Sequence, residues 1–196
     1  VNGILVESGT AVYLYNNFIS DLKAPSASNY EAIRGISLTS TVTNSTIGVY
    51  FNSIYLNASS IGANFGTCGL YHTASATATT ASLDLRNNII VNESTPNGSG
   101  STAAFRRSAG TLGNYAASSN NNIFYAGVPG ANNSILYTGT SYQTIEAYKT
   151  FVGPSRDSLS FSELPPFVNS TTPPYNLRLS DGENSYCESG GQTLTD

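Results

Sequence analysis

Short apolar runs flank an asparagine-rich corner four times along this chain. The clearest copy is LDLRNNIIVN at residues 83–92, where two apolar runs enclose an asparagine pair. The other copies are VYLYNNFISD at 12–21, GVYFNSIYLN at 48–57 and ASSNNNIFYA at 117–126. The first asparagines fall at Asn16, Asn52, Asn87 and Asn121, with spacings of 36, 35 and 34 residues. This near-constant period predicts one structural unit used four times.

A second marker keeps step with the asparagines. A small residue followed by an apolar one opens an alternating segment in each copy, at Gly3-Ile4, Gly35-Ile36, Gly69-Leu70 and Ala104-Phe105. Apolar and polar positions then alternate with period two, as in Leu83-Asp84-Leu85-Arg86, which predicts strands with one buried face. Each unit therefore reads strand, turn, strand, asparagine turn, strand, loop.

One such unit cannot bury its apolar side alone, but coiled copies can stack on one another. The sequence predicts an all-β fold, a right-handed parallel β-helix of about four or five rungs over residues 1–140. Leucine-rich repeats have shorter units with a strict leucine pattern, and propeller blades carry antiparallel hairpins, so both alternatives fit less well.

Stacking the copies gives columns of equivalent residues. We expect three columns to point inward, namely Phe18, Ile54, Ile89 and Ile123, then Leu14, Tyr50 and Leu85, then Ile4, Ile36, Leu70 and Phe105. A mixed column should face outward, namely Tyr15, Phe51, Arg86 and Asn120. We expect a structural asparagine ladder at Asn16, Asn52, Asn87 and Asn121, because asparagine tolerates a left-handed corner and stacked amides hydrogen-bond along the ladder.

The tail departs from the repeat. Residues 142–151, YQTIEAYKTF, have apolar positions at helical spacing, with Ser141 or Thr144 available as a cap, so one short helix is expected there. The proline-rich segments at 165–168 and 173–179 read as extended chain. We expect residues 141–196 to close the same domain, since an open β edge needs a cover.

Composition limits the classes of function. Only 10% of the 196 residues are charged and the net charge is −4, with 8 Lys and Arg in total. These values argue against a nucleic-acid partner. No apolar run approaches the roughly 20 residues of a membrane-spanning helix, so no membrane insertion is expected. The chain contains no methionine, which we interpret as a processed product or an excerpt of a longer chain.

The two cysteines, Cys68 and Cys187, leave two alternatives open. They could form a disulfide in an exported protein, or remain two buried thiols that pack as small apolar side chains. One histidine and two separated cysteines do not make a zinc set, so neither a metal nor a cofactor is expected.

The rung motif resembles the parallel β-helix repeat of pectate-lyase-like proteins. The tail, with TIEAYKTFVGPSRDSLSFSELPPFVN followed by PPYNLRLSDGENSYCESGG, resembles the closing segment of large secreted bacterial surface proteins of the type IX secretion kind. The resemblance covers nearly the whole chain and implies a secreted, extracellular or cell-surface location. Most members of that group have no assigned activity, so it implies the fold and the location more than a reaction.

Candidate chemistry is sparse. The acidic residues are scattered, and Asp84 with Arg86 reads as a solvated surface pair. The best constellation is a candidate glycan-binding patch of Tyr71, His72, Arg106 and Arg107, because the two segments align so that Tyr71 lies beside Arg106 and His72 beside Arg107. Such groups could stack on a sugar ring and bind a carboxylate or sulfate. Ordinary exposed side chains at a strand end are the alternative, and no catalytic residue is assigned.

These observations lead to two hypotheses of function. The first is a structural or adhesive segment of a larger cell-surface or fibre-forming protein, without catalysis, able to associate end to end and to bind polysaccharide or other surface proteins. The second is a carbohydrate-active β-helix, either a polysaccharide lyase or a non-catalytic glycan-binding domain. A cluster of charge on one outer face would favour the second.

Overall fold

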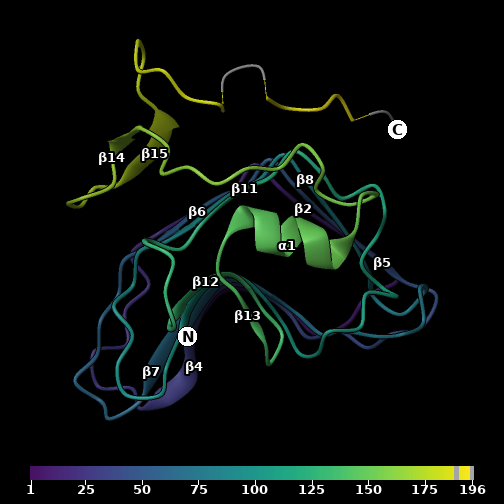
Figure 1. Ribbon diagram of the computed structural model, residues 1–196, viewed down its shortest axis with the longest axis horizontal. Helices are drawn as coiled ribbons and strands as arrows, with labels where there is room; N and C mark the ends of the chain where they lie inside the picture. Colours follow the sequence, from purple (N-terminus) through teal and green to yellow (C-terminus); the bar gives the residue numbers. More distant parts are fainter. Residues whose placement is uncertain (188–189, 195–196) are drawn as a thin grey trace.

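The computed structural model describes residues 1–187 and 190–194. The chain forms a parallel β-solenoid of about four turns with one short helix, as the repeat predicts. Figure 1 looks along the coil, so that strands of successive turns lie behind one another. Each of the first three turns contributes one strand to each of three sheets, and neighbouring turns pair in parallel.

The three sheets have six, three and four strands. The six-stranded sheet contains β1 (Asn2–Val6), β4 (Asn29–Leu38), β7 (Phe65–His72), β10 (Thr102–Arg107), β12 (Asn133–Tyr137) and β13 (Ser141–Tyr142). The three-stranded sheet contains β2 (Ala11–Tyr15), β5 (Thr46–Tyr50) and β8 (Ser82–Arg86). The four-stranded sheet contains β3 (Phe18–Ile19), β6 (Ser53–Leu56), β9 (Ile89–Asn92) and β11 (Ile123–Tyr125).

The core is a stack of equivalent apolar side chains inside the coil. In the six-stranded sheet the predicted inward column is confirmed, because Ile4, Ile36, Leu70 and Phe105 pair in register. Ile4 is partly buried and the other three are fully buried, as is Leu136, which continues the column. The last turns are richer in aromatic rings, with the Phe105 ring centroid 5.5 Å from Tyr115 and 6.2 Å from Phe124. These contacts thicken the core toward the end that the helix covers.

The glycines of the second marker lie where two sheets approach closely. A Cβ atom on Gly35 would lie 2.4 Å from the Gly69 carbonyl oxygen and 2.6 Å from Ile54 Cγ2. One on Gly69 would lie 2.3 Å from Ile90 Cγ2. Any larger residue would therefore push the six-stranded sheet away from the four-stranded sheet. This explains why a small residue opens each copy.

The other predicted columns are wrong by one residue in the second copy. The observed register pairs Tyr15 with Tyr50 and Arg86, and Leu14 with Val49 and Leu85. Tyr50 therefore belongs to the outer column that had been assigned to Phe51. In the four-stranded sheet the inward side chains are Ile19, Ile54, Ile90 and Phe124, so the predicted inward column is right only for Ile54. Its other members, Phe18, Ile89 and Ile123, align with Ser53 instead, and Phe18 is 58% exposed.

The asparagine corner has two columns with separate roles. The left-handed backbone position is taken by Asn16, Phe51, Asn87 and Asn121, with φ between 54° and 59°. The hydrogen-bonded ladder is the next column, made by Asn17, Asn52, Asn88 and Asn122. Of the four predicted asparagines, Asn52 alone makes the predicted ladder bonds, whereas Asn16, Asn87 and Asn121 have the predicted left-handed backbone and Asn52 does not.

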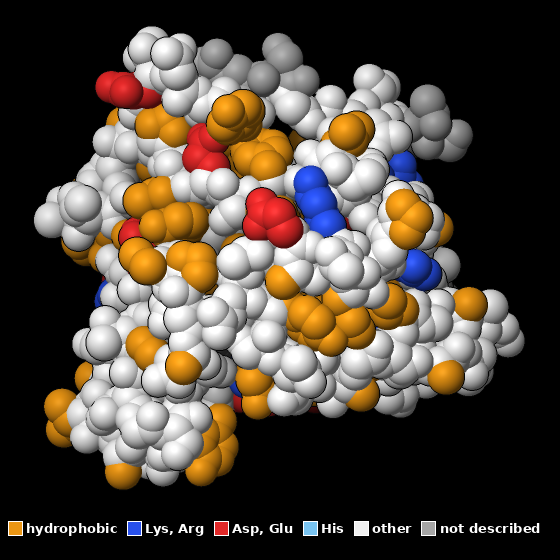
Figure 2. Space-filling model, in the orientation of Figure 1, with side chains coloured by type: hydrophobic (Ala, Val, Ile, Leu, Met, Phe, Trp, Pro, Cys, Tyr) orange, Lys and Arg blue, Asp and Glu red, His pale blue; other side chains and the backbone are white. Residues whose placement is uncertain are grey.

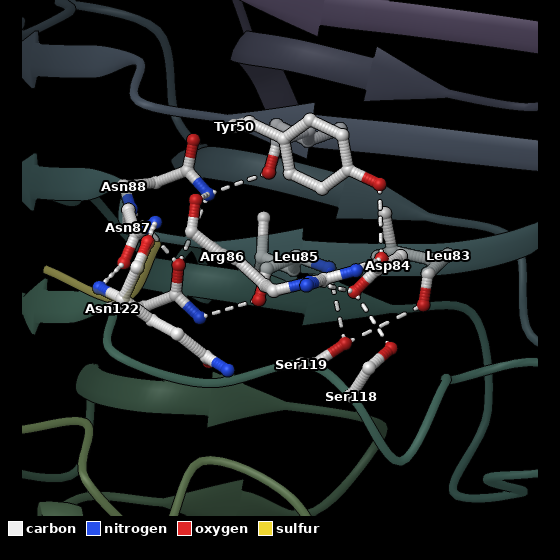
Figure 3. Close-up of polar contacts among 12 residues, drawn as sticks. Tyr50, Leu83, Asp84, Leu85, Arg86, Asn87, Asn88, Ser118, Ser119 and Asn122 are labelled. Carbon is white, nitrogen blue, oxygen red and sulfur yellow. Dashed lines mark hydrogen bonds and ion pairs between the residues drawn. The ribbon is translucent and has the colours of Figure 1, made fainter. Parts of the chain in front are cut away.

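In the ladder each amide oxygen accepts from the turn before it. Asn88 Oδ1 accepts from Asn52 Nδ2 at 3.0 Å and from the Asn52 backbone N–H at 3.0 Å. Asn122 Oδ1 accepts the same pair of bonds from Asn88. The asparagine amides also donate to strand carbonyls, as Asn88 Nδ2 does to Val49 O at 2.8 Å. Figure 3 shows Asn88 and Asn122 in this arrangement.

The helix α1 (Ile145–Val152) lies across one end of the coil (Figure 1). Thr144 caps it, since its Oγ1 accepts from the Ala147 N–H at 3.2 Å, so the predicted helix and one of its two candidate caps are confirmed. Tyr148 and Val152 point into the core and are almost fully buried. Figure 2 shows that this end presents mainly uncharged side chains, with a few separate charged groups.

Beneath the helix, Asp157 ends the asparagine ladder. Its Oδ1 accepts from Asn122 Nδ2 at 2.9 Å and from Ser160 Oγ at 2.5 Å. Its Oδ2 accepts the hydroxyls of Tyr115 and Tyr148, each at 2.5 Å. Burial raises the pKa of this carboxyl, and the four hydrogen bonds partly oppose that rise. The end that α1 covers thus contains a buried polar cluster around Asp157, surrounded by aromatic rings.

The remaining tail packs outside the coil. Strands β14 (Phe167–Asn169) and β15 (Asn176–Leu179) form an antiparallel pair, as the extended segments predict. Phe167 meets the ring of Tyr55 edge-on at 5.9 Å, and Leu177 is buried against Tyr55 and Val91. The pair therefore covers the outer face of the four-stranded sheet.

The opposite end of the coil is open. Strands β1, β2 and β3 are each the last strand of their sheet. Inward side chains of this first turn, Ile4, Val12 and Leu14, are only partly buried, whereas Ile36 in the second turn is fully buried. Within residues 1–187 and 190–194, no helix is long and apolar enough to cross a membrane.

Candidate functional site

The four residues predicted to form one patch are paired as expected but face in two directions. Tyr71 pairs with Arg106, and His72 with Arg107, across β7 and β10. Tyr71 and Arg106 lie on the outer face of the sheet. His72 and Arg107 point inward, with exposed fractions of 0% and 1%. The prediction that all four share one exposed patch is therefore wrong, because neither His72 nor Arg107 can reach a ligand on the surface.

His72 and Arg107 form a buried polar cluster between the strand ends and the following loop. Arg107 donates to His72 Nδ1 at 2.7 Å, to Asn114 Oδ1 at 2.8 Å and to Thr111 O at 2.9 Å. His72 Nε2 lies 3.0 Å from Ala81 O. Because Nδ1 accepts from the guanidinium, Nε2 must carry the proton and donate to that carbonyl.

This cluster holds a cation without a carboxylate in direct contact. Burial lowers the pKa of Arg107 to about 10, and the hydroxyls of Tyr115 and Tyr148 act in the opposite direction. The guanidinium carbon lies 5.4 Å from the centroid of the Tyr115 ring, whose hydroxyl donates to Asp157. Burial and the Arg107 charge together lower the pKa of His72 to about 3, so the imidazole is neutral near pH 7. The cluster stabilises the fold and offers no accessible acid or base.

On the outer face of the six-stranded sheet, arginines alternate with tyrosines. We call Glu31, Arg34, Tyr71, Arg106 and Tyr137 the arginine–tyrosine face. The Arg34 guanidinium lies 3.7 Å from the Tyr71 ring centroid, and that of Arg106 lies 4.4 Å from the Tyr137 ring. The Glu31 carboxylate pairs with both arginines, with Arg106 Nε at 2.9 Å. The guanidinium groups of Arg34 and Arg106 are thus held in place by a tyrosine ring and by the Glu31 carboxylate.

Cys68 lies beneath this face as a fully buried thiol, and it forms no disulfide with Cys187. Burial raises the pKa of the Cys68 thiol to about 12, against the opposing charges of Arg34 and Arg106. The thiol is therefore protonated and unreactive near neutral pH. Of the two alternatives left open by the sequence, the buried thiol holds for Cys68.

A second polar cluster lies on the outer face of the three-stranded sheet (Figure 3). We call Tyr13, Tyr50, Asp84, Arg86 and Ser118 the Asp84 groove. Asp84 accepts from the Tyr50 hydroxyl at 2.9 Å, from Ser118 Oγ at 2.9 Å and from Arg86 Nε at 2.9 Å. The Tyr13 and Tyr50 rings stack with centroids 6.4 Å apart. These residues come from four successive turns.

The Asp84 carboxylate is fixed in its ionised form. Burial acts to raise its pKa, but the hydrogen bonds from Arg86, Ser118 and Tyr50 outweigh burial and lower it. Burial and the bond to Asp84 raise the pKa of Tyr50 to about 12. A carboxylate held by three neighbours is a poor general base, and a tyrosine with a raised pKa is a poor nucleophile. The arrangement suits binding better than proton transfer.

The Asp84 groove is an open depression of about 290 Å³ beside two aromatic rings. Tyr13 is 59% exposed, so its ring is available to a planar or cyclic ligand. The sequence indicated only the Asp84–Arg86 pair, which is half-buried and networked rather than merely solvated. The contribution of Tyr50 was missed because the second copy was aligned one residue out of phase with Asp84 and Arg86. The alignment of the third and fourth copies already placed Ser118 level with Asp84, but its hydrogen bond was not inferred.

Among residues 1–187 and 190–194, no group of three or more His, Cys, Asp or Glu side chains could hold a metal ion. Comparison of the chain with protein-family models, with curated proteins and with solved structures finds no match.

Proposed function

We propose that this chain is an extracellular structural and adhesive β-solenoid segment of a larger surface protein, and that it acts by docking and binding rather than catalysis. The observation that carries the proposal is the contrast between the two ends of the coil. One end is covered by α1 and by the buried polar cluster around Asp157. The other end presents three edge strands and a half-exposed apolar core.

The open end also carries a specific hydrogen-bonding position. Asn52, Asn88 and Asn122 each accept a backbone N–H and a side-chain N–H from the preceding turn. Asn17 begins the ladder, and no described residue donates to its Oδ1. A further turn with asparagine at the same corner would supply both donors. The surface therefore suits another coil of the same repeat presented in parallel.

This contrast also limits self-association. A fibre of identical contacts needs two complementary open ends, whereas here the α1 end lacks a free rung. We therefore propose that docking takes place at the edge formed by β1, β2 and β3 and not at the α1 end. The resemblance of the tail to surface proteins of the type IX secretion kind supports a secreted location, which remains part of the proposal.

Adding one turn tests the docking proposal. The register pairs Asn2 with Arg34 and Arg34 with Cys68, so residues 34–67 make one complete turn. A copy of this unit placed before Asn2 should slow hydrogen exchange of the first-turn amides at least about tenfold, because the edge becomes an interior rung. The same added unit with its copy of Asn52 changed to Ala should protect them less. Unchanged exchange with a protease-sensitive added unit would contradict the proposal.

The second candidate is non-catalytic glycan binding, favoured by aromatic rings beside oriented arginines on two outer faces. Tyr13 in the Asp84 groove is exposed and can stack on a sugar ring, whereas the Tyr71 ring is already covered on one face by the Arg34 guanidinium. Arg106 can donate hydrogen bonds to a carboxylate or sulfate in addition to Glu31. The Asp84 carboxylate already accepts hydrogen bonds from Arg86, Ser118 and Tyr50, which makes it a poor general base and favours binding without turnover.

A panel of acidic and neutral polysaccharides tests this candidate. We expect affinity without new reducing or unsaturated ends, lowered roughly 3- to 10-fold by Tyr13→Ala or by Arg106→Ala according to the face used. Tyr186→Ala serves as the control, since Tyr186 is exposed outside both faces. Arg107 is left intact because it is interior. Cleavage of the polysaccharide that disappears in either variant would contradict the proposal that the site is non-catalytic. Equal affinity of all variants would exclude both the Asp84 groove and the arginine–tyrosine face as glycan-binding sites.

A further inference from the structure

The C-terminal tail is held by asparagine side chains through its backbone. Asn87 Nδ2 donates to Gln192 O at 2.7 Å, and the Gln192 N–H donates to Asn87 Oδ1 at 2.7 Å. Asn121 Nδ2 donates to Gly190 O at 2.8 Å. Both asparagines occupy the left-handed corner position, which points their amides outward from the coil. These bonds are made to the peptide backbone of the tail and do not depend on its side chains.

An apolar cavity lies between the tail and the coil. Its volume is about 190 Å³, and its apolar walls come from Phe51, Ile89, Ile123, Phe161 and Leu179. Gly190 and Gly191 form part of its rim on the tail side. The cavity is only half enclosed, so part of it is open to solvent. Because glycine has no side chain, the tail spans this space without filling it.

The two glycines differ in what a side chain would meet. A Cβ atom on Gly190 would lie 2.5 Å from Tyr186 O, which is a clash with backbone. A Cβ atom on Gly191 would meet the Asn87 amide at 3.7 Å and 4.0 Å, which is ordinary contact. Gly191 does not have a positive φ. Position 191 can therefore carry a side chain, whereas position 190 cannot.

We propose that this corner is a binding site for an extended peptide with a bulky apolar residue at the place of Gly191. The tail of the chain occupies the site in this structure but leaves the cavity unfilled. Such a peptide would form the same backbone bonds to Asn87 and Asn121 and would fill the cavity as well. The site would thus recognise an apolar side chain in an otherwise unspecified extended segment, as groove-and-backbone recognition does elsewhere.

The first test uses the full chain with Gly191→Leu. Exchange of the Gln192 amide, measured by NMR, should slow at least about tenfold, which is the lower end of what burial of a leucine contributes. Gly190→Leu is the matched control and should speed exchange. Asn87→Gly should also speed it, whereas Asn16→Gly, at an equivalent corner that the tail does not contact, should leave it unchanged. Unaltered or faster exchange in Gly191→Leu would overturn the proposal.

The second test supplies the peptide separately. Fluorescently labelled YSESGGQTL, the sequence 186–194 with serine for Cys187, is titrated into the wild-type chain beside the form with leucine at the Gly191 position. The leucine peptide should bind at least about tenfold more tightly, even against the high effective concentration of the tethered tail. Equal affinities would show that the cavity takes no part in recognition.

Discussion

Replacing Asn88 by Ala is expected to lower the free energy of unfolding by about 3 kcal/mol, whereas Asn87→Gly should lower it by less than about 1 kcal/mol. The two residues are adjacent and chemically identical. They differ in what their amides contact. Asn88 is buried in the ladder and Asn87 occupies the left-handed corner beside it.

The large effect of Asn88→Ala follows from the bonds that its amide makes. Its oxygen accepts two N–H groups of Asn52, and its Nδ2 donates to Val49 O, Arg86 O and Asn122 Oδ1. Alanine leaves the Asn52 backbone N–H buried with no partner and opens a gap between two turns. Each buried polar group left unsatisfied costs about 1–3 kcal/mol. Coupling along the ladder adds to this cost.

Asn87→Gly removes much less. Its φ of 59° is a conformation that glycine adopts without strain, so the corner is kept. The loss is confined to the two bonds with Gln192 at the surface. Chemical denaturation of both variants, monitored by far-ultraviolet circular dichroism, compares them directly. Similar losses for the two variants would mean that the ladder and the corner are not separate columns.

The register error shows where sequence reasoning stops. The period, the fold and the small residue opening each copy were readable, because repetition and alternation are local signals. Aligning the single Asn52 with the first asparagine of each pair shifted the second copy by one residue. In fact Phe51 holds the left-handed position there. A bulky aromatic residue is an unusual choice at that position, so residue preference misled the alignment.

The site shows a different limit. Alternation starting from the inward Leu70 and Phe105 already places His72 and Arg107 inside the coil. The prediction nevertheless placed both in a surface patch, on the alignment of the two segments alone, and an arginine is indeed rarely buried. What permits burial is the loop after β10, which brings Thr111 and Asn114 to the guanidinium. Such partners come from a non-repeating segment, and the periodic pattern does not reveal them.

The second large effect is expected from pH acting on His72. Between pH 7 and pH 5 the free energy of unfolding should fall by about 2 kcal/mol in the wild type relative to His72→Gln. Glutamine is uncharged and can accept from Arg107 and donate to Ala81 O as His72 does. Urea denaturation at intervals of half a pH unit gives the two curves.

The sign follows from the two protonation states. Burial and the neighbouring Arg107 charge hold the pKa of His72 at about 3 in the folded chain, against about 6.5 when unfolded. Below pH 6.5 the unfolded chain binds a proton that the folded chain refuses, so stability is lost as pH falls toward 3. Arg107 keeps its charge throughout, since its pKa is about 10.

Asp157 titrates in the opposite sense and must be separated from this effect. Its pKa is raised by burial, so protonation of the folded chain adds stability as the pH falls through that value. The contribution is common to the wild type and His72→Gln, and it cancels in the difference between their curves. A difference that stays flat from pH 7 to pH 5 would mean that His72 takes up a proton in the fold. The adjacent buried cation makes that outcome unfavourable, because it would place two positive charges 2.7 Å apart between Arg107 and His72 Nδ1.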